Sequence, residues 1–226
     1  MSRQTERTRT TRVWDLPVRL FHWAIVLLVV SQIVTVSIGG NAMEYHVLGG
    51  YALLTLVVFR IVWGFLGTPT ARFINFLGGP RAALRYAKSI LSSSPEHAVG
   101  HNPLGGWSVV AMLMSILVQA VSGLFADDDI MTTGPLWKYV SDDTADTFNV
   151  IHETNAVVLL TLICVHLAAI LFYLLRKREN LIKPMFTGNK LLTDDAMDSL
   201  RPFEGTLRAL IILSVCAAAT WAVVTY

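Results

Sequence analysis

Residues 149–177 read NVIHETNAVVLLTLICVHLAAILFYLLRK, a stretch that is apolar over most of its length and holds His152 and His166. The pattern predicts a membrane-spanning helix, since about 20 apolar residues suffice to cross a bilayer. Fourteen residues separate the histidines, so at about 100° and 1.5 Å per residue they share one helix face, roughly 21 Å apart. A polar group inside a membrane is costly without a partner, so both are candidate functional residues.

Composition places the whole chain among membrane proteins. Charged residues make up 15% of its 226 positions and hydrophobic residues 54%, a balance that ordinary soluble domains do not show. Apolar segments predict five spans, at residues 21–38, 47–66, 106–126, 150–175 and 207–225. The first span is expected to be retained, because the charged 20 residues before it and the lack of a cleavage site do not fit a signal peptide.

The basic residues are distributed asymmetrically between the predicted loops. Of the 18 Lys and Arg residues, Lys138 alone falls on the side opposite to all the others. By the positive-inside rule, the N-terminus is cytoplasmic and, after five spans, the C-terminus is outside. The outer loops carry acidic residues that either steer a basic partner or are ordinary solvated charges: Glu44, Asp127, Asp128, Asp129, Asp142, Asp143, Asp146 and Glu153.

Several local features complete the sequence-based prediction. Residues 1–12 are polar and rich in Arg and Thr, so they are expected to form a mobile cytoplasmic tail. Asp15 and Pro17 predict the start of the first helix, and residues 78–91, GGPRAALRYAKSIL, predict a short basic helix at the membrane surface. Cys164 and Cys216 lie inside spans without ligand spacing, so both are interpreted as small apolar residues.

Two further histidines pair by depth with those of the fourth span. His22 lies near the inner side of the first span and His46 at the outer start of the second. His22 therefore matches His166, and His46 matches His152. Opposed imidazoles at one depth are what bis-histidine haem ligation requires, whereas a zinc site usually adds thiolates or carboxylates. The pattern favours two haems stacked across the bilayer.

The residues near these histidines allow more than one interpretation. Gly49 and Gly50 leave bare backbone beside His46 for a flat group or for another helix. Arg60 lies within the second span near its inner end, where it either snorkels to the interface or binds an anion such as a haem carboxylate. The third span offers only Gln119 and Ser122 to chemistry.

Several motifs in the same order make the chain resemble the bacterial cytochrome b561 and nickel-iron hydrogenase b-type cytochrome family. They are WDLPVRLFHW (14–23), HVLGGY (46–51), FRIVWGFLG (59–67), GHNPLGGW (100–107), IHETNAVVLLTLICVHLAAILFY (151–173), KRENLI (177–182) and TGNK (187–190). The resemblance covers about residues 13–190. It implies a four-helix transmembrane bundle with two non-covalent b haems, with residues 191–226 adding a linker and a fifth transmembrane helix.

The resemblance also implies ligands and partners. His22 and His166 are expected to hold the inner haem, and His46 and His152 the outer one, in a bacterial inner-membrane protein that exchanges electrons between quinone and a periplasmic cytochrome c or hydrogenase-like subunit. From their position at the cytoplasmic side, Arg19, Arg60 and His101 are candidates for contact with haem propionates or a quinone headgroup, with snorkelling or loop solvation as the alternative for each. No nucleic-acid partner is expected. Two alternatives stay open: a stand-alone oxidoreductase that passes electrons from a donor such as superoxide to quinone, and a haem-free anchor or transporter.

Overall fold

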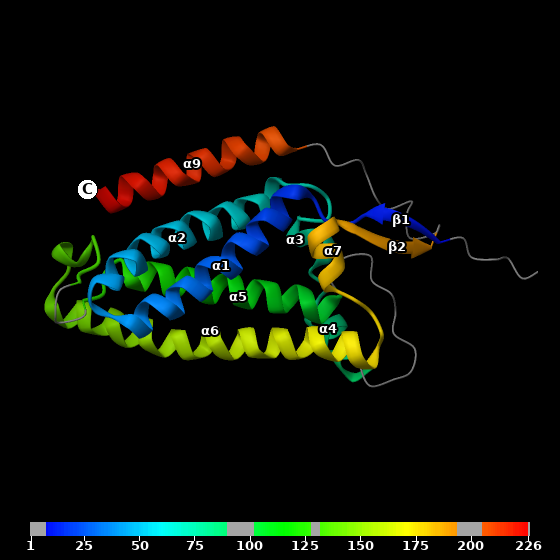
Figure 1. The fold of residues 1–226 in the computed structure, drawn as a ribbon, viewed down its shortest axis with the longest axis horizontal. Coiled ribbons are helices and arrows are strands. Elements are labelled where there is room, and N and C mark those ends of the chain that lie inside the picture. Colours follow the sequence, from blue (N-terminus) through cyan, green and yellow to red (C-terminus); the bar gives the residue numbers. More distant parts are fainter. Residues whose placement is uncertain (1–7, 90–101, 128–131, 194–204, 226) are drawn as a thin grey trace, which may run out of the picture.

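The computed structural model describes residues 8–89, 102–127, 132–193 and 205–225 and shows a helical bundle (Figure 1). Within these residues, five helices are long and apolar enough to cross a membrane: α1 (Leu16–Ile38), α2 (Met43–Leu66), α5 (Pro103–Gly123), α6 (Asp142–Arg176) and α9 (Thr206–Thr225). The five predicted spans are confirmed. The chain is therefore an all-α, multi-pass membrane protein.

Local side-chain chemistry fixes where the spans begin and end. The carboxylate of Asp15 accepts a hydrogen bond from the backbone N–H three residues later and caps α1, and the amide oxygen of Asn102 does the same for α5. Gly39 ends α1 with a φ of 65°, a conformation that glycine adopts without strain. The short helix η1 (Gly40–Ala42) then leads directly into α2.

Helix α6 begins well before its apolar part. Its first residue is Asp142, whereas the predicted span starts at residue 150. Asp142 and Asp143 occupy the first turn, where acidic side chains are stabilised by the partial positive charge of the helix N-terminus. Hydropathy identifies only the apolar part of such a helix, so the polar turns outside the bilayer are missed.

Four of the spans form the bundle, and the fifth lies outside it. Helix α1 packs on α2, α2 on α5, and α5 on α6, while α9 packs on α2 (Figure 1). Buried apolar side chains join α2, α5 and α6 at the centre of the bundle: Leu53, Val57, Leu113, Ile116 and Leu159. A second cluster around Trp63 includes Ala209 and Cys216 of α9. Both sulfhydryls are free, with Cys164 exposed on the apolar surface.

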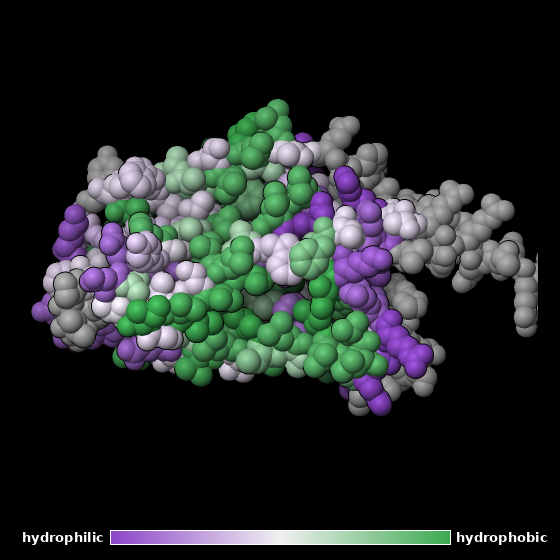
Figure 2. All heavy atoms as spheres, viewed as in Figure 1, coloured by the Kyte–Doolittle hydropathy of each residue, from purple (hydrophilic) through white to green (hydrophobic). Residues whose placement is uncertain are grey.

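The surface divides into an apolar middle and two polar ends. Figure 2 shows hydrophobic residues around the middle of the bundle and hydrophilic residues at its two ends. We call the end with α4 (Pro80–Ser89) and α7 (Ile182–Thr187) the basic end, and the end with η1, η2 (Trp137–Tyr139) and the first turns of α6 the acidic end. The apolar middle is the part that contacts lipid.

At the basic end, two distant segments pair as a small antiparallel sheet. Strand β1 (Thr8–Arg12) pairs with β2 (Asn189–Thr193), with Thr10 opposite Leu191. The structure therefore differs from the predicted mobile tail at residues 8–12, while residues 1–7 lie outside the described part. Gly188, with a φ of 81°, continues the pairing through its carbonyl, which accepts from the N–H groups of Val13 and Trp14.

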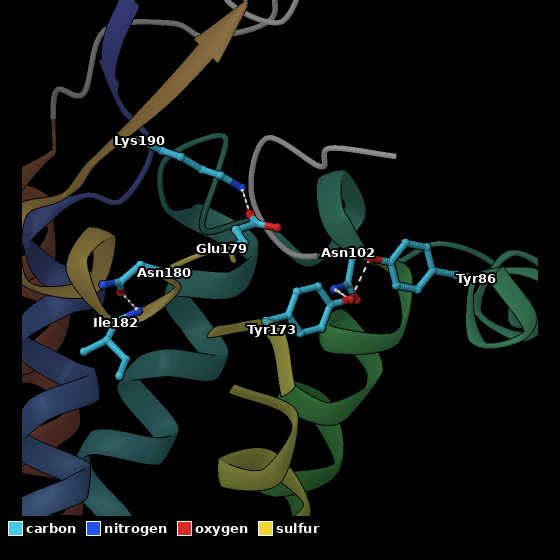
Figure 3. Close-up of polar contacts among 7 residues, drawn as sticks. All are labelled: Tyr86, Asn102, Tyr173, Glu179, Asn180, Ile182 and Lys190. Carbon is cyan, nitrogen blue, oxygen red and sulfur yellow. Dashed lines mark hydrogen bonds and ion pairs between the residues drawn. The ribbon is translucent and has the colours of Figure 1, made fainter. Parts of the chain in front are cut away.

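Polar contacts tie the surface segments of the basic end to the spans (Figure 3). The hydroxyl of Tyr173, near the end of α6, lies 2.8 Å from the hydroxyl of Tyr86 on α4 and accepts a 3.1 Å hydrogen bond from Asn102. Glu179 forms a 2.8 Å ion pair with Lys190 of β2. The predicted basic helix is present as α4, and the short helix α3 (Phe73–Phe76) precedes it.

Candidate functional site

The structure brings His46 and His152 together near the acidic end. His46 comes from the first turn of α2 and His152 from α6, and both are half-buried. Their ring centroids are 6.4 Å apart and the ring planes lie at 73°. Metal–imidazole bonds are about 2 Å long, so two imidazoles that share one metal ion have centroids roughly 6 Å apart. The separation of these two rings therefore fits a shared iron.

Hydrogen bonds favour one tautomer of His152. The Ser122 hydroxyl, from a side chain that is only 2% exposed, is in position to donate to the carbonyl of Val118 at 2.8 Å. Its oxygen lies 3.1 Å from Nδ1 of His152 and, with the hydroxyl proton directed to Val118, can accept from that nitrogen. This arrangement favours a proton on Nδ1 and a free lone pair on Nε2.

His46 has similar hydrogen-bond partners, which come from α1. The Thr35 hydroxyl donates to the carbonyl of Ser31 at 2.8 Å, and its oxygen lies 3.4 Å from Nδ1 of His46. The carbonyl of Gln32 is a second acceptor at 3.3 Å. Metal-binding histidines characteristically donate their other N–H to such an acceptor. Both rings are thus oriented for ligation before any metal is bound.

Small residues border this pair. A Cβ added to Gly123 would lie 3.0 Å from Cε1 of His152, so a side chain at this position would press on the ring. Gly49 and Gly50, the two glycines noted in the sequence, have different surroundings. A Cβ added to Gly49 would meet the Gln32 side chain of α1, which supports close helix packing. A Cβ added to Gly50 would have no atom within 4 Å. The position next to Gly50, one turn from His46, is therefore open.

The second pair, His22 and His166, lies toward the basic end. The two side chains are close enough to interact electrostatically. Nδ1 of His22 is buried and has no hydrogen-bond partner. The neighbouring Trp23 packs edge-on against the His22 ring, at 5.1 Å between centroids, and stacks on Phe186 of α7 at 4.2 Å. A buried ring nitrogen without a partner is unusual, and it distinguishes His22 from the two outer histidines.

Arg60 does not snorkel. Its side chain is 2% exposed and its guanidinium lies 5.3 Å from the centre of the Phe73 ring. Nη1 is buried without a hydrogen-bond partner, an arrangement that is costly unless an anion binds there. Of the two interpretations given above, the one in which the side chain reaches the interface is wrong, because Phe73 of α3 lies against the guanidinium and the side chain is buried. The anion-binding interpretation remains a proposal.

The other two candidates have different positions. Nη1 of Arg19 donates a short hydrogen bond to the carbonyl of Phe186, so one part of the guanidinium fastens α7 to α1. The Nε atom of Arg19 is buried without a partner. His101 lies outside the described residues. Among the described residues, no three or more His, Cys, Asp or Glu side chains are grouped so that they could hold a metal ion.

Two polar residues near His152, Ser115 and Asn155, were not identified from the sequence, although Gln119 and Ser122 beside them were. Asn155 receives a 3.0 Å hydrogen bond from the Ser115 hydroxyl and donates to the Gln119 side chain at 2.7 Å. Residues 115, 119 and 122 recur at helical spacing on one face of α5. That spacing, opposite His152 and Asn155, is the signal that could have revealed a polar seam between α5 and α6.

With the site described, comparison with known proteins is informative. The family described as prokaryotic cytochrome b561 matches residues 13–188. The chain belongs to this family. The cytochrome therefore carries electrons across a membrane and uses b-type haem, and the predicted family resemblance is confirmed.

The individual relatives have low sequence identity to this chain. The cytochrome is 23% identical over 215 residues to a "Probable Ni/Fe-hydrogenase B-type cytochrome subunit" of Rhizobium leguminosarum bv. viciae, which covers 80% of this chain and 89% of the relative. A protein of the same name from Azotobacter vinelandii is 26% identical over 224 residues, covering 82% of this chain and 90% of the relative. No solved structure matches the cytochrome.

Proposed function

We propose that the cytochrome transfers electrons through two b haems, one held by His46 and His152 and the other by His22 and His166. The observation that carries the proposal is the outer pair, in which the rings lie 6.4 Å apart and each Nδ1 is hydrogen-bonded. The spacing of fourteen residues along α6 repeats the arrangement at the second level. Haem supplies one-electron chemistry at each level.

The protein's own residues define what kind of electron transfer takes place. The four imidazoles would hold both haem irons, so substrates would have no access to iron and electrons would pass by outer-sphere transfer. Leu53, Val57 and Leu159, between the two histidine levels, are buried and exclude water from the path. The buried Nη1 of Arg60 is the proposed partner of an inner haem propionate, since a guanidinium pairs readily with a carboxylate.

Charge supports an orientation in a bacterial inner membrane. The basic end is proposed to face the cytoplasm, because Lys138 is the single basic residue of the sequence assigned to the other side. The N-terminus is then cytoplasmic and the C-terminus periplasmic. In this orientation His46 and His152 hold the outer haem, and His22 and His166 the inner one.

Two redox partners follow from this arrangement. The relatives' names include a hydrogenase, and a hydrogenase-like subunit is the proposed periplasmic partner. A periplasmic cytochrome c is the alternative at the same acidic end. Quinone is the proposed second partner, because a haem inside the apolar layer is accessible to a carrier that dissolves in lipid.

Haem content tests the proposal directly. The purified full chain should contain two b haems, measured as pyridine haemochrome per polypeptide, and its reduced-minus-oxidised spectrum should have a b-type band with low-spin character. A ratio of one haem, or a high-spin component that binds carbon monoxide in the native protein, would contradict ligation by four histidines.

Ionic strength tests the role of the acidic end. With a basic soluble cytochrome c as probe, the rate of electron transfer should fall as salt is raised from 10 to 300 mM, because salt screens attraction between exposed charges. The control is a neutral electron donor such as a reduced phenazine, whose rate should change little. A probe rate independent of salt excludes steering by this surface.

A further inference from the structure

The two histidine pairs differ in how their second ring nitrogens are satisfied. At the outer level, Nδ1 of His152 faces the Ser122 hydroxyl, and Nδ1 of His46 faces both the Thr35 hydroxyl and the carbonyl of Gln32. Each hydroxyl also contacts a carbonyl of its own helix, to which it can donate its proton, so its oxygen can accept from the imidazole. At the inner level, Nδ1 of His22 is buried with no partner. The same ligand type therefore has two different environments in one molecule.

This difference acts on the iron through the imidazole. An N–H that donates to an oxygen gives the ring partial imidazolate character and makes the opposite nitrogen a stronger electron donor. A stronger donor stabilises ferric iron, which carries the extra positive charge, more than ferrous iron. The hydrogen-bonded pair thus lowers the reduction potential of its haem, and a ring without such a bond leaves the potential higher.

A buried positive charge at the inner level also raises the reduction potential of the inner haem relative to that of the outer haem. Arg60 follows His46 by fourteen residues on α2, as His166 follows His152 on α6. Both helices begin at the acidic end, so Arg60 and His166 lie at similar depth, about 21 Å along from the outer pair. The Arg60 guanidinium is 2% exposed, and a positive charge in such a medium stabilises the ferrous state of a nearby haem. The Asp15 carboxylate offsets part of this positive charge by a longer-range electrostatic interaction. The contacts among the described residues include no ion pair between Asp15 and Arg60.

We infer that Ser122 and Thr35 are positioning residues that hold the outer haem at a lower reduction potential than the inner one. The inference rests on the proposed function, because it requires both haems. The two hydroxyls act through His152 and His46 and do not touch the iron. An electron that enters at the acidic end then moves toward the basic end with a favourable free-energy change.

Potentiometric titration of the purified full chain tests this inference. The wild type should titrate in two steps, and His152→Ala should remove the lower one, which assigns that step to the outer haem. Ser122→Ala should raise the lower step and leave the upper one in place, and Thr35→Val should raise the lower step less, because the carbonyl of Gln32 still accepts from His46. We expect up to about a tenfold change in the ferrous-to-ferric ratio at fixed ambient potential, which corresponds to about 59 mV for one electron.

Two matched variants separate tuning from general disturbance. Ser37→Ala removes another hydroxyl of α1 that bonds back to its own helix, at Ile33, but does not contact a histidine, so both steps should stay unchanged. Ser122→Thr keeps a hydroxyl at the same place and should restore the wild-type potential.

The outcomes distinguish this inference from the proposed function. One haem per wild-type chain would overturn the proposed function itself. Two haems with a lower step that neither Ser122→Ala nor Thr35→Val raises, or that Ser37→Ala raises equally, would overturn the tuning alone. Loss of the outer haem in both hydroxyl variants would assign the hydroxyls a structural role and would also overturn the tuning.

Discussion

Replacement of His152 by alanine should halve the haem content of the cytochrome. The outer haem loses one of its two proposed ligands, and the 6.4 Å pair with His46 no longer exists. The inner haem should remain, because about 21 Å of helix separates the two levels. Pyridine haemochrome per polypeptide should fall from two to one, with the remaining haem still low-spin.

Two companion variants make this result specific. Glu153→Gln changes the adjacent, exposed side chain and should keep both haems. His166→Ala should give the reciprocal loss of the inner haem. If His152→Ala keeps two haems, or if it loses both while the protein stays folded by circular dichroism, the assignment of ligands by level is wrong.

Replacement of Asp15 by alanine should destabilise the fold by about 3–5 kcal/mol. Asp15 is 3% exposed and accepts from the backbone of Val18 at 2.7 Å, from the indole of Trp63 at 3.1 Å and from the hydroxyl of Thr68. Alanine leaves these buried donors unpaired, and each orphaned group costs about 1–3 kcal/mol. It also removes a negative charge that interacts favourably with the buried Arg60.

Thermal unfolding in detergent, followed by circular dichroism, measures this effect. Asp15→Ala should lower Tm strongly, and Asp15→Asn should lower it less because the amide keeps one acceptor oxygen. Asp146→Ala removes an exposed carboxylate of α6 and is the matched control with unchanged Tm. An equal Tm for Asp15→Ala and the wild type would show that the three donors find other partners.

The general fold followed from the sequence because its determinants are local. About 20 apolar residues define a span, and Asp15, Gly39 and Pro103 mark helix ends through their own backbone chemistry. The depth of each histidine in the bilayer could also be predicted, because depth depends only on the position along a span and on the direction of the chain. Hydropathy indicates the position along the span, and the charges of the loops indicate the direction.

The remaining features depend on how the helices rotate and on distant pairing. Ser122 is a histidine partner because α5 turns that face toward α6, and no local pattern fixes such a rotation. The burial of Arg60 depends on Phe73, which arrives from a separate short helix. The pairing of β1 with β2 joins residues more than 170 positions apart in strands with little apolar alternation, so the periodicity of either strand alone did not predict it.

The β1–β2 pairing also imposes an order on the biogenesis of the cytochrome. Strand β1 emerges from the ribosome first, but its partner is complete only at Thr193, after the residues of α1, α2, α5 and α6. The pairing therefore cannot close until the chain of all four bundle helices has been synthesised. Helix α9 comes after Thr193 in the sequence, so β1 and β2 can pair at the basic end of the bundle before α9 is synthesised.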